Sequence, residues 1–372
     1  MRTLLITGGA GFIGANLVHY WARQYPRDRL VVLDALTYAG NSANLETLPA
    51  QANFRFVHGN ICDQLLVDQL LAEEGIDTIV HFAAESHVDR SIVDPEAFIQ
   101  TNVIGTHTLL KAAQKAWLGN PGSSRGRDDV LFHHVSTDEV YGSLGPDDPP
   151  FSETTPYAPN SPYAASKAAS DHLVRSYYHT YGLPITTSNC SNNYGPYQFP
   201  EKLIPLMLIN ALDGKPLPIY GDGGNIRDWL QVEDHCRGIE LMMNKGRRGE
   251  TYNIGGHNEV TNLEIVHLLC RNLDHHFAAD PALARRFPHC PAARGKNCAE
   301  LISFVKDRPG HDHRYAIDPT RAETELGYKP AYSFKKGISA TIAWYLAHEP
   351  WWRAIMDGSY AEWVNSNYGN RG

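Results

Sequence analysis

The sequence feature that most constrains this fold is a glycine-rich turn near its start. An apolar run from Thr3 to Thr7 leads into Gly8-Gly9-Ala10-Gly11-Phe12-Ile13-Gly14, and a helical pattern from Asn16 to Trp21 follows. Glycines let such a turn bend tightly and approach a pyrophosphate, while the N-terminus of the next helix offers N–H groups to the negative charge. The order strand, glycine turn, helix therefore predicts a nucleotide-binding α/β unit.

A carboxylate follows at the spacing typical of dinucleotide-binding units. The next apolar run, Leu30 to Leu33, ends in Asp34, twenty residues beyond Gly14. A carboxylate there accepts hydrogen bonds from the adenosine ribose and repels a 2′-phosphate, which favours NAD over NADP. The alternative is an exposed strand-end or helix-capping residue that binds no ligand.

The alternation of strands and helices continues along the chain. Apolar runs at 54–57 and 78–82 alternate with helical patterns, which predicts a doubly wound parallel α/β sheet with right-handed crossovers. Asn60-Ile61 and the segment 82–86 follow these runs, at the sheet edge where open α/β sheets bind ligands, so we expect them to flank adenine and nicotinamide. We predict a Rossmann lobe over residues 1–188, to which a segment near 229–254 returns, and a smaller, interleaved substrate-binding lobe over 189–372.

The composition excludes several classes of protein. A formal net charge of −8 disfavours a nucleic-acid-coating surface, and no apolar run approaches the roughly 18 residues of a membrane helix. The six cysteines include no Cys-x-x-Cys pair, so we expect reduced thiols and no metal site. The N-terminus enters a strand pattern directly, without the apolar region of a signal peptide. These features indicate a cytoplasmic enzyme or binding protein.

A hydroxyl and two carboxylates stand together in Ser136-Thr137-Asp138-Glu139-Val140-Tyr141-Gly142, just after an apolar run. In a regular strand Asp138 and Glu139 would point to opposite faces, so only one could reach a shared ligand. If both take part in chemistry, the strand must end here. The alternative has one carboxylate capping the next helix and the other in a surface salt bridge.

A tyrosine and a lysine are expected on one face of a helix further on. Ser161 suits an N-cap and Pro162 the first helical position, so a helix is predicted from there. Tyr163 and Lys167, four residues apart, would then lie together, and the ammonium could stabilise the phenolate. With a positively charged nicotinamide this would bring the tyrosine pKa from about 10 towards neutrality and make it a general base. Alone, the pattern also occurs by chance on many helices.

Together these residues resemble the extended short-chain dehydrogenase/reductase family and, more narrowly, the dTDP-glucose 4,6-dehydratases. The resemblance covers almost the whole chain. It also includes the segments 36–41, 83–91, 189–196, 200–205 and 307–312. The glycine turn and the Tyr/Lys pair identify only the wide family, whereas the Thr-Asp-Glu triplet and the later segments are more specific.

The resemblance implies an enzyme that holds NAD tightly and acts on dTDP-glucose. The implied cofactor contacts come from the glycine turn, the strand ends and two helices: Gly8, Gly11, Phe12, Ile13, Gly14, Asp34, Thr37, Asn60, Ile61, Phe82, Ala83, Ala84, Ser86, Thr101, Tyr163 and Lys167. Two positions depart from the family pattern, because Ala35 stands where lysine is frequent and Asn60 where aspartate is common.

Carried over to this sequence, the family chemistry assigns catalytic roles. Tyr163, supported by Lys167, removes the O4 proton while the C4 hydride passes to NAD, and Thr137 hydrogen-bonds that oxygen. Glu139 then removes the C5 proton, Asp138 as a neutral acid protonates the departing C6 hydroxyl, and the hydride returns to C6. These roles require unlike pKa values, with that of Asp138 raised by burial and by the charge of Glu139.

The resemblance also implies a substrate pocket in which cations counter the diphosphate of the nucleotide sugar. Its expected residues are Ser86, His87, Thr137, Asn192, Glu201, Lys202, Leu203, Pro218, Ile219, Tyr220, Arg227, Asn262, Arg308, His311 and Tyr360. A homodimer packed through the helices after Pro95 and Pro162 is implied, as is the supply of a 4-keto-6-deoxy sugar for rhamnose and related polysaccharides.

Three alternatives stay open at this point. A 4,6-dehydratase of another nucleotide sugar would share the whole triplet. A nucleotide-sugar 4-epimerase needs NAD, tyrosine and lysine but gives Asp138 and Glu139 no task, and a non-catalytic NAD-binding regulator leaves all five catalytic candidates without one. The segment 277–303, rich in Ala, Arg and Pro, has no assigned role.

Overall fold

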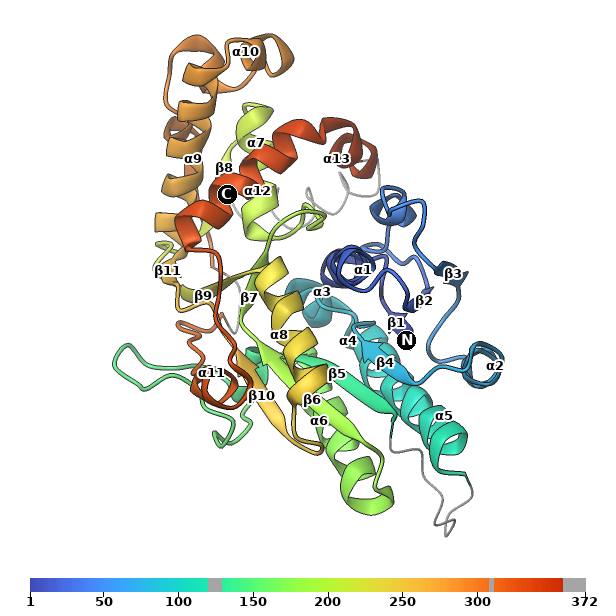
Figure 1. Cartoon of the computed structure of the whole chain (residues 1–372). Helices are drawn as coiled ribbons and strands as arrows, with labels where there is room; N and C mark the ends of the chain where they lie inside the picture. Colours follow the sequence, from blue (N-terminus) through green and yellow to red (C-terminus); the bar gives the residue numbers. More distant parts are fainter. Residues whose placement is uncertain (120–128, 308–310, 357–372) are drawn as a thin grey trace.

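Seven parallel strands form the central sheet within the residues that the computed structural model describes, 1–119, 129–307 and 311–356 (Figure 1). The strand order is β10-β6-β5-β4-β1-β2-β3, which is the doubly wound arrangement predicted from the sequence. The strands are β1 (Thr3–Thr7), β2 (Arg29–Asp34), β3 (Phe54–His58), β4 (Thr78–His81), β5 (Leu131–Thr137), β6 (Ile185–Cys190) and β10 (Thr251–Ile254). The strand order reverses beside β1, and ligands bind at such a reversal, outside the carboxyl ends of the strands.

Helices cover both faces of this sheet (Figure 1). α1 (Phe12–Gln24) and α8 (Val232–Lys245) pack on one face, and α2 (Gln64–Glu74), α5 (Thr106–Leu118) and α6 (Pro162–Tyr181) on the other. Because successive strand residues point to opposite faces, Leu4 and Ile6 join the core under α1 and α8, whereas Leu5 joins the core under α2 and α5. Burial on both faces explains why the strands read as continuous apolar runs.

Local sequence fixes where α6 begins and ends. The Ser161 hydroxyl accepts a hydrogen bond from the backbone N–H of Ala164 (3.1 Å), Pro162 occupies the first turn, and Gly182 with φ 72° ends the helix. The helix start predicted from Ser161 and Pro162 is confirmed. This start sets the helical register of Tyr163 and Lys167.

The helix predicted after Pro95 contains an irregular stretch. α4 (Pro95–Phe98) continues through η2, a π-helical stretch over Ile99–Gly105, into α5. Such stretches are rare and are frequent at functional sites. Here the π-helical stretch places Thr101 in the wall of the cavity described below.

A second core lies beyond β6. It is built on the sheets β11-β9-β7 and β12-β8, with β7 (Asn192–Tyr194), β8 (Leu217–Tyr220), β9 (Ile226–Gln231), β11 (Glu259–Thr261) and β12 (Ile302–Val305). α7 (Leu203–Leu212), α9 (Asn262–Ala279), α12 (Phe334–Ala347) and α13 (Glu349–Ile355) pack around them. α9 begins with a capping box, in which Thr261 and Glu264 bond reciprocally.

The segment 277–303 folds against α9 at one end of the molecule (Figure 1). It forms α10 (Ala282–Arg286) and the 3₁₀ turns η4 (Pro291–Arg294) and η5 (Cys298–Leu301), and it buries Leu283 and Phe287 in the second core. Cys290 and Cys298 are also buried there, as free thiols with sulfurs 3.6 Å apart. The segment thus extends the second hydrophobic core.

Later parts of the chain return to the core under α1 and α8. β10 pairs in parallel with β6, and α11 (Thr320–Leu326) contributes Ala322 and Leu326 to the core under α1 and α8. The return begins at the end of β9, where Leu230 lies in this core, although β9 pairs within the smaller sheet, and it continues through α8. The lobe boundaries 1–188 and 189–372 stay a prediction. In the described ranges, no helix combines the length and the apolarity needed to cross a bilayer.

Candidate active site

A cavity of about 310 Å³ opens at the carboxyl ends of the central strands. The loops after β1, β2, β3, β4 and β5 all reach it. All of the predicted cofactor residues line it: Gly8, Gly11, Phe12, Ile13, Gly14, Asp34, Thr37, Asn60, Ile61, Phe82, Ala83, Ala84, Ser86, Thr101, Tyr163 and Lys167. The fold therefore brings these residues from six separate stretches of sequence to one place.

The glycine turn is shaped by close backbone packing. Gly8 has φ 69°, and a Cβ at this residue would lie 2.7 Å from the backbone nitrogen of Ala83. A Cβ at Gly14 would lie 2.3 Å from the carbonyl oxygen of Gly8. α1 begins here without a side-chain cap, so its N-terminus faces the cavity as an anion-binding group. These features fit a pyrophosphate.

Asp34 braces this turn. Its carboxylate accepts hydrogen bonds from the backbone N–H groups of Ala10 (2.9 Å) and Leu36 (2.8 Å). Burial raises its pKa, and these backbone bonds oppose the rise. A carboxylate at this edge of the cavity fits a ribose diol and disfavours a 2′-phosphate.

The Thr-Asp-Glu triplet stands where a strand changes into a 3₁₀ turn. β5 ends at Thr137, and η3 (Asp138–Tyr141) follows at once. The change in backbone direction places Asp138 and Glu139 in the wall of the same cavity, as expected if both serve one ligand. Asp138 is only 1 % exposed, and Thr137 rather than Asp138 caps the following turn, so Asp138 fills neither role of the alternative.

The surroundings of Asp138 favour its neutral form. Burial and the nearby charge of Glu139 raise the pKa of Asp138 well above its usual range. Its Oδ1 accepts from the Thr137 hydroxyl at 3.4 Å, while its buried Oδ2 has no hydrogen-bond partner within the described residues. A protonated carboxyl with an unpaired oxygen, on a residue that lines the cavity, is suited to general-acid chemistry.

Tyr163 and Lys167 both line the cavity, but the protein alone does not activate the tyrosine. Burial and the charge of Glu139 raise the pKa of Tyr163, and a hydrogen bond with Thr137 opposes the rise. The Lys167 ammonium donates to the backbone carbonyl of Val135 (2.8 Å). A lowered Tyr163 pKa thus requires a further positive charge in the cavity, and it stays a prediction for the cofactor-bound state.

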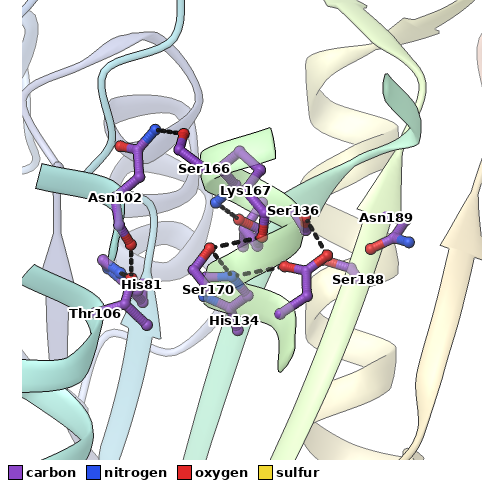
Figure 2. Close-up of polar contacts among 12 residues, drawn as sticks. His81, Asn102, Thr106, His134, Ser136, Ser166, Lys167, Ser170, Ser188 and Asn189 are labelled. Carbon is purple, nitrogen blue, oxygen red and sulfur yellow. Dashed lines mark hydrogen bonds and ion pairs between the residues drawn. The ribbon is translucent and has the colours of Figure 1, made fainter. Parts of the chain in front are cut away.

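A buried polar network lies beneath Lys167 (Figure 2). Asp171, one helical turn after Lys167, accepts from the Ser136 hydroxyl (2.8 Å) and contacts His134 Nε2 (3.0 Å). Burial raises the pKa of Asp171 to about 6, and the Lys167 charge opposes the rise. Burial lowers the pKa of Lys167, whereas Asp171 raises it, so an ionised Asp171 helps to keep the lysine charged.

A second cavity, of about 170 Å³, adjoins the first, and both are lined by Glu139, Asn192, Glu201 and Lys202. The predicted substrate residues found in the second cavity are His87, Asn192, Glu201, Lys202, Leu203, Pro218, Ile219, Tyr220, Arg227, Asn262 and His311. Ser86 and Thr137 line the first cavity instead. Arg308 and Tyr360 lie outside the described residues.

Tyr315 is a wall residue that the sequence did not single out. It lines the second cavity with Glu139, and the Arg227 guanidinium lies 4.3 Å from the centre of its ring. Arg227 also donates to the backbone carbonyl of Asp312 (2.9 Å). The only sequence signal was proximity, because Tyr315 follows the motif 307–312 by three residues.

The geometry defines a class of protein. A doubly wound sheet, an open glycine turn, a bracing aspartate and a Tyr/Lys pair around one cavity are the parts of a dinucleotide-dependent enzyme of the short-chain dehydrogenase/reductase type. Among the described residues, no group of three or more His, Cys, Asp or Glu is arranged to hold a metal ion.

Comparison with known proteins narrows this class. The profile of the GDP-mannose 4,6 dehydratase family matches residues 5–341. The chain is 55% identical over 361 residues to a dTDP-glucose 4,6-dehydratase of Xanthomonas campestris pv. campestris, with 97% of each chain covered. It is 51% identical over 360 residues to the enzyme of that name from Neisseria meningitidis serogroup B, covering 97% of this chain and 98% of the relative. The dTDP-glucose 4,6-dehydratase of Streptomyces venezuelae, solved with NAD bound, superimposes with a TM-score of 0.83 at 47% identity and covers 95% of this chain and 100% of its own. The chain belongs to the dTDP-glucose 4,6-dehydratase family.

Proposed function

We propose that this protein is an NAD-dependent dTDP-glucose 4,6-dehydratase that releases dTDP-4-keto-6-deoxy-glucose, which makes it a hydro-lyase. The observation that carries the proposal is the placement of Asp138, Glu139 and Tyr163 around one cavity. A 4-epimerase would need the tyrosine but has no task for two carboxylates. Elimination of water needs an acid and a base of unlike pKa, and the raised pKa of buried Asp138 supports it as the acid.

NAD is the cofactor that the first cavity fits. The glycine turn and the N-terminus of α1 would hold its pyrophosphate, Asp34 the adenosine ribose, and Lys167 the nicotinamide ribose. When bound, NAD takes the C4 hydride of the sugar and later supplies it to C6. The carboxylate of Asp34 supports NAD rather than NADP, and the close backbone packing at Gly8 and Gly14 supports a turn that receives the pyrophosphate.

The residues of the chain move protons around this hydride exchange. Tyr163 accepts the proton from O4, and the Thr137 hydroxyl orients that oxygen. Glu139 removes the C5 proton, which the new 4-keto group has made acidic, while Asp138 gives its proton to the C6 hydroxyl as water leaves. Glu139 then returns a proton to C5. Since burial and the proximity of Glu139 keep Asp138 protonated, the acid is ready before substrate arrives.

The second cavity would hold the nucleotide part of dTDP-glucose. Arg227 lies in its wall together with Lys202, which donates to the Ser86 carbonyl at 3.0 Å, so two cations are available to the diphosphate. The dehydratase of another nucleotide sugar is the nearest alternative, because base choice depends on the shape of this cavity.

The test is to incubate the purified protein with dTDP-glucose and catalytic NAD and to measure an alkali-sensitive 4-keto product. We expect product without net reduction of NAD. Turnover of another nucleotide sugar in parallel assays, with none of dTDP-glucose, would refute the assignment.

We also propose that the protein is a homodimer. Apolar side chains are exposed along α3 (Val88–Val93) and the π-helical stretch, where Val93 is 84 % exposed and Ile99 49 % exposed. An exposed apolar band of this kind is typical of an interface. Supply of 4-keto-6-deoxy sugar for rhamnose-type polysaccharides and a cytoplasmic location both stay predictions.

A further inference from the structure

Two loops meet across the mouth of the first cavity. The loop after β2, residues 35–41, contributes Thr37, Ala39 and Gly40 to the cavity wall, and the loop between β7 and α7 contributes Phe199 and Glu201. The loops are more than 150 residues apart in sequence. A dinucleotide lying in this cavity would therefore be bordered by both loops.

Three side chains join these loops, and we name them the Tyr38–Arg90–Glu201 cluster. The Arg90 guanidinium, from α3, lies 3.8 Å from the centre of the Tyr38 ring. Its Nε donates to the Glu201 carboxylate at 3.2 Å. The Tyr38 hydroxyl bonds to the same carboxylate. Each member thus contacts the other two.

Neighbouring contacts reinforce the cluster. The Phe199 ring meets the Tyr38 ring edge to face, with centroids 5.8 Å apart. Glu201 is only 4 % exposed, and its charge is compensated by Lys202, by Arg90 and by the hydrogen bond from Tyr38. Leu36, in the first loop, has φ 49°, a left-handed conformation that a leucine adopts only when surrounding contacts impose it.

The proposed chemistry gives such a closure a purpose. The hydride that leaves C4 must return to C6 of the same sugar, so reduced cofactor that escaped between these steps would leave the enzyme unable to finish. An enzyme of this kind gains from slow release of its dinucleotide. No residue of the catalytic set can supply this property, because none of them joins the two loops.

We propose that the Tyr38–Arg90–Glu201 cluster closes the dinucleotide cleft and sets the rate at which the cofactor leaves. The purpose of this closure rests on the proposed function, whereas its test does not. Release requires the 35–41 loop and the 197–202 loop to part. Parting breaks the hydrogen bond between Tyr38 and Glu201, and it separates the Arg90 guanidinium from one of its two partners.

The experiment measures release of radiolabelled NAD from loaded protein into excess unlabelled NAD, without any sugar. We expect Arg90→Met to raise the release rate about tenfold, since one cation–π contact and one buried ion pair are lost. Tyr38→Leu should act similarly. The matched control is Arg237→Met, because Arg237 also lies over a tyrosine ring and pairs with a carboxylate, but on α8. It should release NAD at the wild-type rate.

A second variant protects the test against misfolding. If Arg90→Met alone is unstable because Glu201 loses this ion pair, Arg90→Met with Glu201→Gln removes both charges, and it should still release NAD faster than the wild type. Release at the wild-type rate from folded Arg90 and Tyr38 variants would overturn the proposal.

Turnover supplies an independent readout. With dTDP-glucose and no added NAD, the Arg90→Met protein should slow progressively and recover when NAD is added, while the wild type holds its rate. Fast release from the variant without turnover by the wild type would leave the closure standing and refute the proposed function. Turnover by the wild type, with NAD release from the variant unchanged, would refute the closure and leave the proposed function standing.

Discussion

The Thr137 hydroxyl accepts a hydrogen bond from the backbone N–H of Glu139 at 3.3 Å, and this contact turns the chain from strand β5 into a 3₁₀ turn. Without the turn, neighbouring side chains would point to opposite faces of the sheet. With it, Asp138 and Glu139 share one cavity, although one is fully buried and the other is not.

Substitution at the two carboxylates should separate elimination from hydride transfer. In Glu139→Gln and Asp138→Asn, Tyr163 is intact, so substrate should still reduce bound NAD, but product release should fall by about 100-fold or more. Absorbance of the reduced nicotinamide during a single turnover measures the first step. Tyr163→Phe is the contrast, because it should block reduction itself. Normal water elimination by Glu139→Gln would show that its assigned role is wrong.

Gly14→Ala should weaken cofactor binding. The new Cβ would lie 2.3 Å from the Gly8 carbonyl oxygen, so the turn must move away from the shape that receives a pyrophosphate. Calorimetric titration with NAD should show at least about a tenfold loss of affinity, which corresponds to about 1.4 kcal/mol. Gly11→Ala is the matched control, since its Cβ would lie 3.3 Å from the same oxygen and the loss should be smaller.

Stability should fall with acid through a buried histidine. His133 is fully buried on β5, and burial lowers its pKa to about 3 from an unfolded value near 6.5. Between these values the unfolded chain binds a proton that the folded protein does not, so the contribution of His133 is complete above pH 6.5 and is lost as pH falls. Relative to His133→Gln, the wild type should lose about 2 kcal/mol of unfolding free energy between pH 7 and pH 5.

Urea denaturation of both proteins at the two pH values measures this difference. Asp171, with its pKa raised to about 6, titrates with the opposite sign in both proteins and cancels from the comparison. An equal acid loss in wild type and variant would contradict the prediction.

A charge placed on the exposed apolar band should disrupt the proposed dimer. Val93→Glu puts a carboxylate at a position that is 84 % exposed in one chain and would be buried in the pair. Sedimentation velocity should then show a monomer. Phe304→Glu is the control, because Phe304 is 58 % exposed on β12, which belongs to a different sheet. Its substitution should leave the sedimentation coefficient unchanged.

The sequence predicted those parts of the fold that local chemistry determines. The glycine turn, Asp34 and the helix start at Ser161 each depend on contacts within a few residues, or on a spacing common to dinucleotide-binding units, and their positions agree with the structure. The need for the strand to end at Thr137 followed from the alternation of side chains alone. These inferences needed no knowledge of distant contacts.

The parts of the fold and of the site that the sequence did not predict depend on long-range packing. Tyr315 lies in the cavity wall against Arg227, which is 88 residues earlier in the chain, and Arg90 pairs with Glu201 across 111 residues. No periodicity marks either residue. Similarly, the composition of the 277–303 segment gave no sign that Leu283 and Phe287 would extend a core built by α9.

The late position of strand β10 in the sequence affects how the protein folds while it is being synthesised. It lies beside β6 at the edge of the large sheet, yet residues 251–254 are made after the whole stretch from β7 to α8. A nascent chain that has emerged only as far as Cys190 therefore displays β6 as an open edge whose backbone groups can pair with another chain. At about 5–20 residues per second this edge stays open for several seconds on the ribosome. A fragment ending near residue 190 should consequently aggregate, and the cofactor-binding half should need its later segments in order to fold.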